Sequence, residues 1–469
     1  MRQTNLGIQP GGRIHMIGIG GSSMSGLAEM LRHEGYPVSG TDSADGYALL
    51  KLRALGVDVR PGHHPDMVAG AELLVYSAAI SKDDPERLEA DRLGIPQMER
   101  AVLLGKIMEN YPVSVCVSGT HGKTTTSAML AQVLNDTGFD PTVHIGGSLD
   151  AIGGSVRLGS GRVFVAEACE FNRSFLHMPV TLALVLNMEE DHLDCYGDMA
   201  HVEEAYLQFL SRLPEDGTAL VYSGDERVTR VTDQLPKMRR QICSFGLDAR
   251  AQFYWEDICY DALGCAGFQF VREGNPLCRV KLRVPGFYNA LHALAALSAA
   301  SVLGADINQG AASLSRYKGA HRRFEHTGTV AGMDMYHDYG HNPAEMQAAV
   351  SMAKLQNRRV IAVMQPHTFS RVKSLFAQYL TCTREADVTL VTDIFAAREK
   401  DPGDINSQML VDGMREHGIS AYLTPGFLDA ERWLLQYGTP GDLVLTMGCG
   451  DINLLNEQMQ SRAQTANPL

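Results

Sequence analysis

Apolar positions in the first hundred residues alternate between short strand-like runs and helical spacing. Residues 14–17 are mostly apolar, glycines interrupt the chain at 18, 20 and 21, and residues 24–33 have the spacing of a helix. Further apolar runs at 36–40 and 72–77 lie on either side of a helical stretch at 47–55. Strands that alternate with helices predict parallel βαβ units, and we expect a first domain over residues 1–107.

The same alternation restarts twice further along the chain. Residues 113–117 predict a strand, followed by a glycine loop and a helix from Thr124 that Gly138 can terminate. The central region has further candidate strands at 162–166 and 181–186 and a long helix at 289–303, and the last region has strands at 359–364, 387–392 and 442–447. We predict an α/β protein of three consecutive Rossmann-like domains with mainly parallel sheets, with boundaries at 1–107, 108–320 and 321–469 and a P-loop ATPase domain in the centre.

Composition and charge exclude several classes of protein. The chain has 469 residues, 45% of them hydrophobic, and its 41 Lys and Arg against 54 Asp and Glu give a formal net charge of -13. This charge opposes binding to nucleic acid or anionic lipid. The sequence has neither an apolar run long enough to span a membrane nor a secretory signal, so we expect no membrane insertion and a cytoplasmic location. Nine cysteines without a CxxC pair predict reduced core thiols, not disulfides or a zinc site.

The strongest chemical motif joins the strand at 113–117 to the following helix. Backbone N–H groups of a glycine loop at a helix N-terminus hold phosphate oxygens, the lysine faces the outer phosphates, and the following threonine hydroxyl can bind Mg²⁺. Val117 stands where the full P-loop pattern has its first glycine, so the loop is a shortened variant. The pattern predicts an ATP site made by Gly119, Thr120, His121, Gly122, Lys123, Thr124 and Thr125.

A Mg·ATP site needs oxygen ligands beyond the loop, and two acidic segments of the central region are suitably placed. Glu167 directly follows the strand at 162–166, and Asp191-His192 comes shortly after the strand at 181–186. Sites of α/β proteins form at the carboxyl ends of parallel strands. We therefore expect Glu167 and His192 near the phosphate loop.

Two other segments concentrate polar residues after strands. Gly18 and Gly20, with Ser23 where a third glycine is usual and Asp42 about 20 residues further on, fit a nicotinamide dinucleotide or any other diphosphate nucleotide. The second segment comprises residues 337–343 and 365–371, which indicate a site late in the chain. Asn342-Pro343 also has the pattern of a capped helix start.

Taken together, these residues resemble the Mur ligase family of peptidoglycan synthesis, and specifically its alanine-adding branch. The resemblance runs from residue 14 to residue 451 and involves eight ordered motifs. They are Gly18-Ile19-Gly20-Gly21 with Met24-Ser25-Gly26, residues 119–125, Glu167-Ala168-Cys169-Glu170, Asp191-His192, Pro285-Gly286 with Asn289, Arg322-Arg323-Phe324, Asp338-Tyr339-Gly340-His341 and Gln365-Pro366-His367.

The resemblance implies a role for each motif. It implies that Gly20, Gly21, Ser22 and Ser25 face the diphosphate of UDP-N-acetylmuramate and that His63 and Ser77 lie near its uridine. By the same match Asn289 contacts adenine, Arg322 and Asp338 reach the ATP phosphates and ribose after the C-terminal domain closes, and Thr124, Glu167 and His192 hold Mg²⁺. His341 and Arg371 would receive the carboxylate of L-alanine. Lys123, Glu167, His192, His341 and Arg371 are the implied catalytic residues.

The implied reaction joins L-alanine to the lactyl carboxylate of UDP-N-acetylmuramate, through an acyl phosphate, with release of ADP and phosphate. Sister enzymes place a second metal with a carbamylated lysine, but no lysine lies between Lys123 and Lys237. This absence favours the alanine-adding branch and leaves Glu203 or Glu204 as substitutes. Thr368 stands where the family has an arginine near the amino acid.

Three alternatives remain open at this stage. A ligase of the same architecture that recycles murein peptides shares the first glycine loop, and a nicotinamide-dependent oxidoreductase would use residues 18–42. The third is a scaffold without catalysis. The sequence does not determine the oligomeric state.

Overall fold

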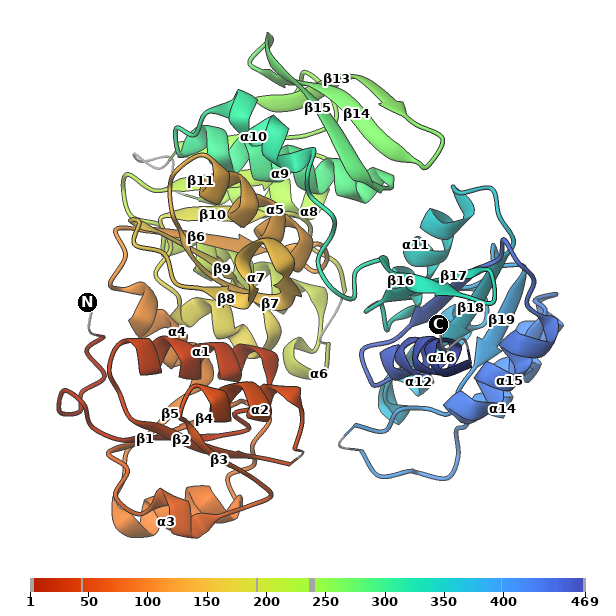
Figure 1. The fold of residues 1–469 in the computed structure, drawn as a ribbon. Coiled ribbons are helices and arrows are strands. Elements are labelled where there is room, and N and C mark those ends of the chain that lie inside the picture. The colour runs from red at the N-terminus through yellow and green to blue at the C-terminus, as the bar shows by residue number, and fades with distance from the viewer. Residues whose placement is uncertain (1–3, 44, 191–192, 236–240, 398, 467–469) are drawn as a thin grey trace. The chain divides into compact units, whose positions relative to one another are not determined.

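The structure is a computed structural model that describes residues 4–43, 45–190, 193–235, 241–397 and 399–466. These residues form three sheets of five, ten and six strands (Figure 1). The chain divides into two compact units, of which the second consists of residues 260–266, 284–286 and 318–469. The first sheet therefore lies in the first unit, as does the second sheet apart from a few residues at strand ends, and each unit is described by itself.

The first sheet is parallel throughout, with the strand order β3-β2-β1-β4-β5. Because the strand order reverses direction beside β1, the loop after β1 opens at the switch point where such sheets bind ligands. The strands are β1 (Ile14–Ile17), β2 (Val38–Asp42), β3 (Asp58–Pro61), β4 (Leu73–Tyr76) and β5 (Gln97–Glu99), and the helices are α1 (Ser22–His33), α2 (Tyr47–Ala54), η1 (Pro65–Val68), α3 (Pro85–Leu93) and α4 (Arg100–Met108).

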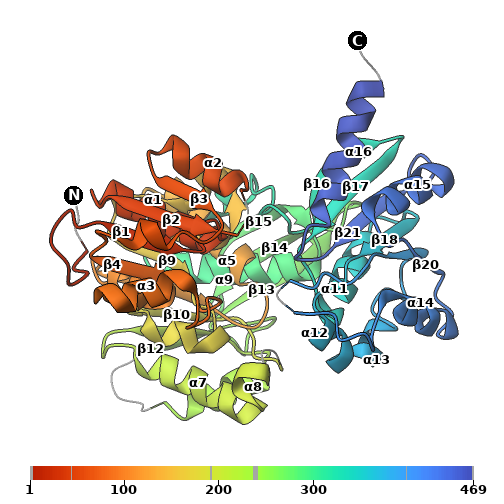
Figure 2. The ribbon, with the colours of Figure 1, turned by 90° about the horizontal axis from the view of Figure 1, so that it is seen from below.

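Alternate residues of β1 serve opposite faces of this sheet. Ile14 and Met16 join the large core that includes residues of α1, whereas Ile17 packs in a smaller cluster with Ala90 of α3. Figure 2 shows α1 and α2 on one side of the sheet and α3 on the other. The two-residue period of a strand therefore sets which helix each side chain meets.

The second sheet has the order β15-β14-β13-β12-β11-β10-β6-β9-β7-β8, and its strand β6 pairs in parallel with both β9 and β10. Its strands are β6 (Val113–Ser118), β7 (Thr142–Leu149), β8 (Gly154–Arg157), β9 (Val163–Glu167), β10 (Leu182–Val185), β11 (Thr218–Tyr222), β12 (Gln241–Phe245), β13 (Phe253–Tyr260), β14 (Cys265–Arg272) and β15 (Asn275–Pro285). Its helices are α5 (Lys123–Asp136), η2 (Asp150–Ile152), η3 (Phe171–His177), α6 (Leu193–Tyr196), α7 (Met199–Ser211), α8 (Glu226–Asp233), α9 (Phe287–Val302) and α10 (Ile307–Leu314).

The third sheet has the order β16-β17-β21-β18-β19-β20, parallel except for the antiparallel pair β16–β17. Its strands are β16 (Glu325–Val330), β17 (Met333–Asp338), β18 (Val360–Met364), β19 (Val388–Val391), β20 (Ala421–Leu423) and β21 (Leu443–Met447). Its helices are α11 (Pro343–Lys354), α12 (Phe369–Ser374), α13 (Phe376–Tyr379), α14 (Ser407–Glu416), α15 (Phe427–Tyr437) and α16 (Asn453–Ala466).

This architecture confirms the expected fold class of three α/β regions with mainly parallel sheets. The apolar runs expected as strands at 14–17, 113–117, 359–364 and 442–447 become β1, β6, β18 and β21. The short edge strand β3, with three of its four residues exposed, carries too little apolar pattern to be found in the sequence. The expectation that all cysteines are core thiols is wrong for Cys195 and Cys259, which are exposed.

A buried polar network lies between the first sheet and α3. His15 Nε2 lies 2.8 Å from Glu86 Oε2, and the same carboxylate accepts hydrogen bonds from Thr41 Oγ1 (2.8 Å) and from the backbone N–H of His64 (2.7 Å). The side chains of His15 and Glu86 are fully buried. Burial alone would raise the pKa of Glu86, but the bonds from His15, His64 and Thr41 outweigh it, so the pKa is lowered.

We expect Glu86→Gln to lower the free energy of unfolding by about 3 kcal/mol at neutral pH, because it leaves donors of a buried pair without their carboxylate. The folded pKa lies below the ordinary value of 4.5. Ionised Glu86 therefore contributes stability above pH 4.5 that is lost as the pH falls through the folded pKa. Urea unfolding at pH 7 and pH 4 should show the difference between wild type and variant shrinking in acid. If the difference in free energy of unfolding between wild type and variant is the same at both pH values, ionised Glu86 does not stabilise the network.

Candidate active site

The predicted phosphate loop lies between β6 and α5. Val117 is fully buried in β6 and pairs with Leu184 and Glu167 on the neighbouring strands. It therefore belongs to the strand, and the loop consists of residues 119–122. Gly122 precedes α5 with φ of +83°, a conformation that favours glycine, and a Cβ at this position would overlap the ring of His292.

A side chain that the sequence did not single out holds this loop in shape. Asn187 follows β10, and its Oδ1 accepts the N–H of His121 at 2.8 Å while its Nδ2 donates to the His121 carbonyl at 3.1 Å. Thr120 Oγ1 accepts the N–H of Glu189 at 2.8 Å. The loop is thus tied to the end of the adjacent parallel strand. The only sequence signal for Asn187 was its place after an apolar strand.

Lys123 pairs with a second carboxylate that the sequence did not assign. Its Nζ lies 3.0 Å and 3.1 Å from the two oxygens of Glu170, and it also donates to the carbonyls of Gly119 and Thr120. The side chains of Lys123 and Glu170 are 15% and 4% exposed. Burial alone would lower the pKa of Lys123, but attraction to Glu170 and Glu167 outweighs it, so the pKa is raised and the amine stays charged.

The predicted metal ligands Thr124 and Glu167 lie side by side. Thr124 Oγ1 donates to Glu167 Oε2 at 3.1 Å, and Glu167 Oε1 accepts the N–H of Gly146 at 2.7 Å. Strand β7 can approach this closely because residues 146 and 147 are glycines. A Cβ on Gly146 would lie 2.9 Å from Glu167 Oε2, and a Cβ on Gly147 would lie 2.7 Å from Thr124 Cγ2.

The arrangement of Thr124 and Glu167 beside the predicted phosphate loop fits a site for Mg²⁺. His192, the third predicted ligand, lies outside the described residues. Among the residues that the structure describes, no group of three or more His, Cys, Asp or Glu side chains forms a metal cluster. Mg²⁺ commonly binds through one or two protein oxygens together with substrate phosphates. A hydroxyl and a carboxylate beside a phosphate loop therefore suffice as the protein's share of the ligands.

The first glycine loop runs from β1 into α1, which has Gly21 as its N-cap residue and no acidic residue in its first turn. Gly20 donates its N–H to Asp42 Oδ2 at 2.8 Å. The hydroxyl of Ser22 donates to the carbonyl of Gly146 at 3.0 Å, and that of Ser25 to the carbonyl of Ser22 at 3.1 Å. The loop therefore meets β7 of the second sheet, whose residue Gly146 also binds Glu167.

The two residues implied for uridine follow neighbouring strands of the first sheet. His63 comes after β3, is largely exposed, and places Nδ1 3.2 Å from the buried carboxylate of Asp84. Ser77 follows β4 and lies beside the first glycine loop, since a Cβ placed on Gly18 would be 3.7 Å from the Ser77 hydroxyl. Both residues lie at the carboxyl edge that also carries the glycine loop.

Asn289 lies in the first turn of α9, one helical turn before His292. Since the His292 ring touches Gly122, this turn of α9 lies beside the phosphate loop. Positions three apart share a helix face. Glu203 and Glu204, on α7, have other partners: Glu203 pairs with Arg230 of α8 at 2.7 Å, and Glu204 accepts from Gln208 of α7 at 3.2 Å.

In the second unit, Arg322 and Asp338 organise the segment that precedes β16. Arg322, with φ of +61°, donates to the carbonyls of Gly448 (3.3 Å) and Gly450 (2.9 Å). Asp338 accepts the N–H groups of Phe324 (2.9 Å) and Gly340 (2.7 Å), and burial raises its pKa. Their roles toward ATP remain predictions.

The structure brings His341 and Arg371 together around His367. Arg371 Nη1 lies 3.3 Å from His367 Nδ1, and the rings of His341 and His367 are 5.6 Å apart. Burial, with the nearby His341 and Arg371, lowers the pKa of His367 to about 4, so its imidazole is neutral at pH 7. Thr368 begins α12 with φ of +35°. One guanidinium and two imidazoles can bind a small carboxylate.

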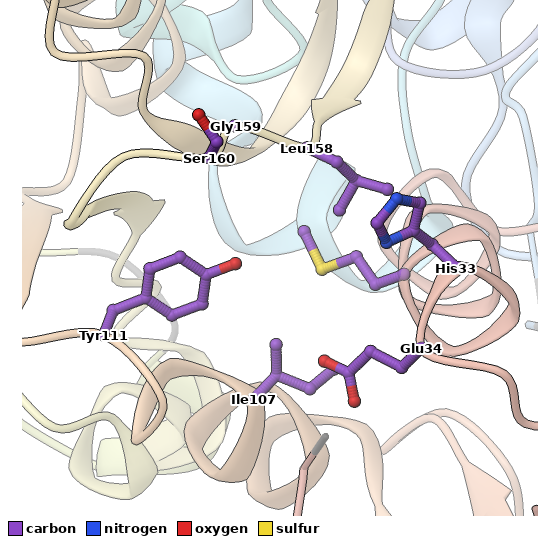
Figure 3. Close-up of a pocket in the computed structure, with 8 residues that line it drawn as sticks. His33, Glu34, Ile107, Tyr111, Leu158, Gly159 and Ser160 are labelled. Atoms are coloured by element: carbon purple, nitrogen blue, oxygen red, sulfur yellow. The ribbon is translucent and has the colours of Figure 1, made fainter. Parts of the chain in front are cut away.

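A cavity of about 520 Å³ opens elsewhere in the first unit (Figure 3). Met30, His33 and Glu34 from the C-terminal end of α1 line it together with Ile107, Tyr111 and residues 158–160. The glycine loop lies at the other end of α1, and none of the predicted site residues lines the cavity. No described helix has both the length and the hydropathy needed to cross a membrane.

Three family models match the chain in order: "Mur ligase family, catalytic domain" at residues 13–112, "Mur ligase middle domain" at 117–300 and "Mur ligase, glutamate ligase domain" at 322–450. The chain belongs to the Mur ligase family. The UDP-N-acetylmuramate–L-alanine ligase of Acetivibrio thermocellus is 42% identical over 446 residues, which are 95% of this chain and 94% of that relative.

Solved structures of Mur ligases share the fold. The crystal structure of UDP-N-acetylmuramate-alanine ligase MurC from Thermotoga maritima matches with a TM-score of 0.84 at 25% identity, over 97% of this chain and 100% of that one. A murein peptide ligase from Psychrobacter arcticus matches with a TM-score of 0.75 at 22% identity, over 98% and 100% of the two chains. At that identity the second match shows the fold alone.

Proposed function

We propose that this Mur ligase joins L-alanine to the lactyl carboxylate of UDP-N-acetylmuramate in peptidoglycan precursor synthesis, converting ATP to ADP and phosphate. The observation that carries the proposal is that Lys123 pairs with Glu170, and Thr124 with Glu167, at the loop between β6 and α5. Similarity to L-alanine ligases over 95% of the chain supports the choice of substrates. Nothing in this proposal requires nucleic acid or insertion into a membrane.

The chemistry follows from what a carboxylate can do. A carboxylate has no leaving group, so one of its oxygens first attacks the γ-phosphorus of ATP, and the bond from that phosphorus to ADP breaks with its electrons leaving on ADP. The amine of alanine then attacks the acyl phosphate, loses a proton, and phosphate departs. Lys123 would neutralise charge on the transferred group. Mg²⁺ bound by Thr124 and Glu167, with His192 as the third predicted ligand, would supply further charge stabilisation.

In the second unit, we propose that Arg371 and His341 receive the carboxylate of alanine. The neutral imidazole of His367, 3.3 Å from Arg371, would hold the guanidinium in place. Arg322 and Asp338 are proposed to act on ATP, and Asn289 on adenine. For the first unit, Gly20, Gly21, Ser22, Ser25, His63 and Ser77 are proposed to bind UDP.

The alternatives differ in what they would consume. A recycling ligase would use a murein peptide as its amine, and the fold alone does not distinguish it. A nicotinamide oxidoreductase would use Asp42 on a ribose, but that carboxylate accepts the N–H of Gly20 at 2.8 Å. The phosphate loop also argues against this class.

A phosphate-release assay with UDP-N-acetylmuramate, ATP and Mg²⁺ tests the proposal. We expect phosphate release to depend on L-alanine, with little release for a murein tripeptide; glycine and L-serine measure the selectivity of the site around Thr368. Release with the tripeptide and not with L-alanine would instead establish the recycling activity. Oxidation of NADH without ATP, or no turnover with any amine, would contradict a ligase.

A further inference from the structure

Arg100 is a positively charged residue in an unfavourable place. It is the first residue of α4, and that helix has no acidic residue in its first turn. A helix N-terminus carries a partial positive charge, which favours anions and disfavours cations. The chain therefore places a cation where its own helix destabilises it.

Arg100 is also half-buried and has no ion-pair partner among the described residues. Among the residues that the structure describes, its hydrogen bond is to a neutral hydroxyl, from Nη1 to Ser23 Oγ at 3.0 Å. No described ion pair includes Arg100, although the preceding Glu99 attracts its charge. Burial lowers the pKa of Arg100, which reflects the cost of a poorly solvated charge. A half-buried, poorly solvated cation of this kind is stabilised when an anion binds beside it.

The groups around Arg100 compensate its charge only in part, through the preceding Glu99. Ser23 Oγ also lies 3.1 Å from His144 Nε2, and burial lowers the pKa of His144 to about 4, so this imidazole is neutral. Cys169 is also close enough to interact with Arg100. Ser23 and His144 supply no negative charge, and Glu99 offsets the charge of Arg100 only in part.

The location of Arg100 indicates which anion it meets. It begins the helix directly after β5, so it lies at the carboxyl edge of the first sheet, as does the loop of residues 18–21 after β1. On its other side, Cys169 lies between Glu167, which binds Thr124, and Glu170, which binds Lys123. Arg100 thus stands between the loop proposed for the sugar diphosphate and the residues proposed for the γ-phosphate of ATP.

We propose that Arg100 binds the lactyl carboxylate of the sugar nucleotide and holds one of its oxygens while the other attacks the γ-phosphorus. This inference rests on the proposed function. The diphosphate and the ATP phosphates already have the amides of the two glycine loops and Lys123, and the carboxylate is the remaining anion that must lie between them. The planar guanidinium suits a carboxylate because it can donate two parallel hydrogen bonds.

The test compares two ligands that differ only in the lactyl group. Calorimetric binding of UDP-N-acetylmuramate and UDP-N-acetylglucosamine is measured for wild type, Arg100→Gln and Arg100→Lys. We expect Arg100→Gln to weaken the binding of UDP-N-acetylmuramate about 30-fold, because a charge-assisted bond to the carboxylate is lost. The affinity for UDP-N-acetylglucosamine, which has no such carboxylate, should stay within about twofold of wild type. Arg100→Lys keeps the positive charge but cannot donate two parallel hydrogen bonds, so it should weaken the binding of UDP-N-acetylmuramate less than Arg100→Gln does.

Arg92→Gln is the matched control, because it removes one arginine from the exposed ion pair with Glu89 on α3. It should bind both ligands as wild type does. Thermal unfolding of each variant checks the fold, and Arg100→Lys keeps the test available if Arg100→Gln does not fold.

Three results would overturn the inference. Equal weakening of both ligands by Arg100→Gln would place the guanidinium on the shared UDP-sugar portion. If Arg100→Gln binds both ligands as wild type does, Arg100 contacts neither ligand and its role is limited to the hydrogen bond with Ser23. If wild type itself binds the two ligands equally, the proposed substrate is wrong, and the inference fails with it for a distinguishable reason.

Discussion

Replacing Lys123 with methionine, together with Glu170→Gln, is expected to reduce kcat/KM for phosphate release by about 1,000-fold. The amine is the charged group placed to neutralise the transferred phosphoryl group, and loss of one such stabilising donor has an effect of about this size. The single replacement is a poorer test, because it would leave Glu170, 4% exposed, as a buried charge without its partner and destabilise the fold by roughly 3–5 kcal/mol.

The double variant removes both charges of the buried pair and should keep the wild-type unfolding temperature to within a few degrees. Glu170→Gln alone serves as the reference for the second substitution. Initial rates at saturating UDP-N-acetylmuramate and L-alanine, measured over a range of ATP concentrations, separate ATP binding from the chemical step. Turnover of a folded double variant within tenfold of Glu170→Gln would refute the assignment of Lys123.

Glu167→Gln is expected to reduce activity at least about 100-fold at millimolar Mg²⁺, with partial recovery as Mg²⁺ is raised. An amide oxygen can still accept from Thr124 or from Gly146, so the local hydrogen bonds change little, but the negative charge that attracts the ion is lost. Activity as a function of Mg²⁺ concentration measures the effect. Chelation of Mg²⁺ should silence the wild-type enzyme reversibly.

A matched control for this variant is Glu226→Gln, which neutralises an exposed glutamate in the first turn of α8. It should retain the Mg²⁺ dependence of wild type. If Glu167→Gln loses activity but keeps an unchanged Mg²⁺ dependence, Glu167 is not a metal ligand. Its role would then be limited to holding Thr124 and the Gly146 segment.

The buried contacts of the phosphate loop explain why its sequence departs from the full P-loop pattern. Val117 takes the place of the first glycine because β6 continues through it, fully buried between two parallel neighbours. The loop is shorter by this extension of the strand. Asn187 then supplies two hydrogen bonds to His121 that hold the shortened loop against β10.

Ser23 has a comparable explanation in the first glycine loop. A third glycine is usual at this position because it allows the helix to pack closely against the strand. Here the Ser23 hydroxyl contacts Arg100 and His144 and so joins α1, α4 and β7. The departure from the dinucleotide pattern therefore reflects packing against the second sheet, which agrees with a sugar nucleotide ligand more than with a nicotinamide cofactor.

The sequence by itself determined the features that depend on neighbouring residues. Apolar periodicity located β1, β6, β18 and β21, because buried parallel strands are short continuous apolar runs. The succession of strand, glycine loop and Lys-Thr predicted a phosphate site, since a helix N-terminus can bind phosphate through its own backbone. Glu167 was found by its place at the end of a strand.

The tertiary structure decided everything that depends on residues far apart in the chain. Lys123 and Glu170 are 47 positions apart, and Arg100 and Ser23 are 77 apart, so no local pattern could pair them. The polar strand residue His15 has the sequence pattern of an ordinary surface position, yet it is fully buried because Glu86, on α3, reaches it. Burial of charge is a property of the folded chain, and only the fold shows which charges are balanced and which, like Arg100, are available for an anion.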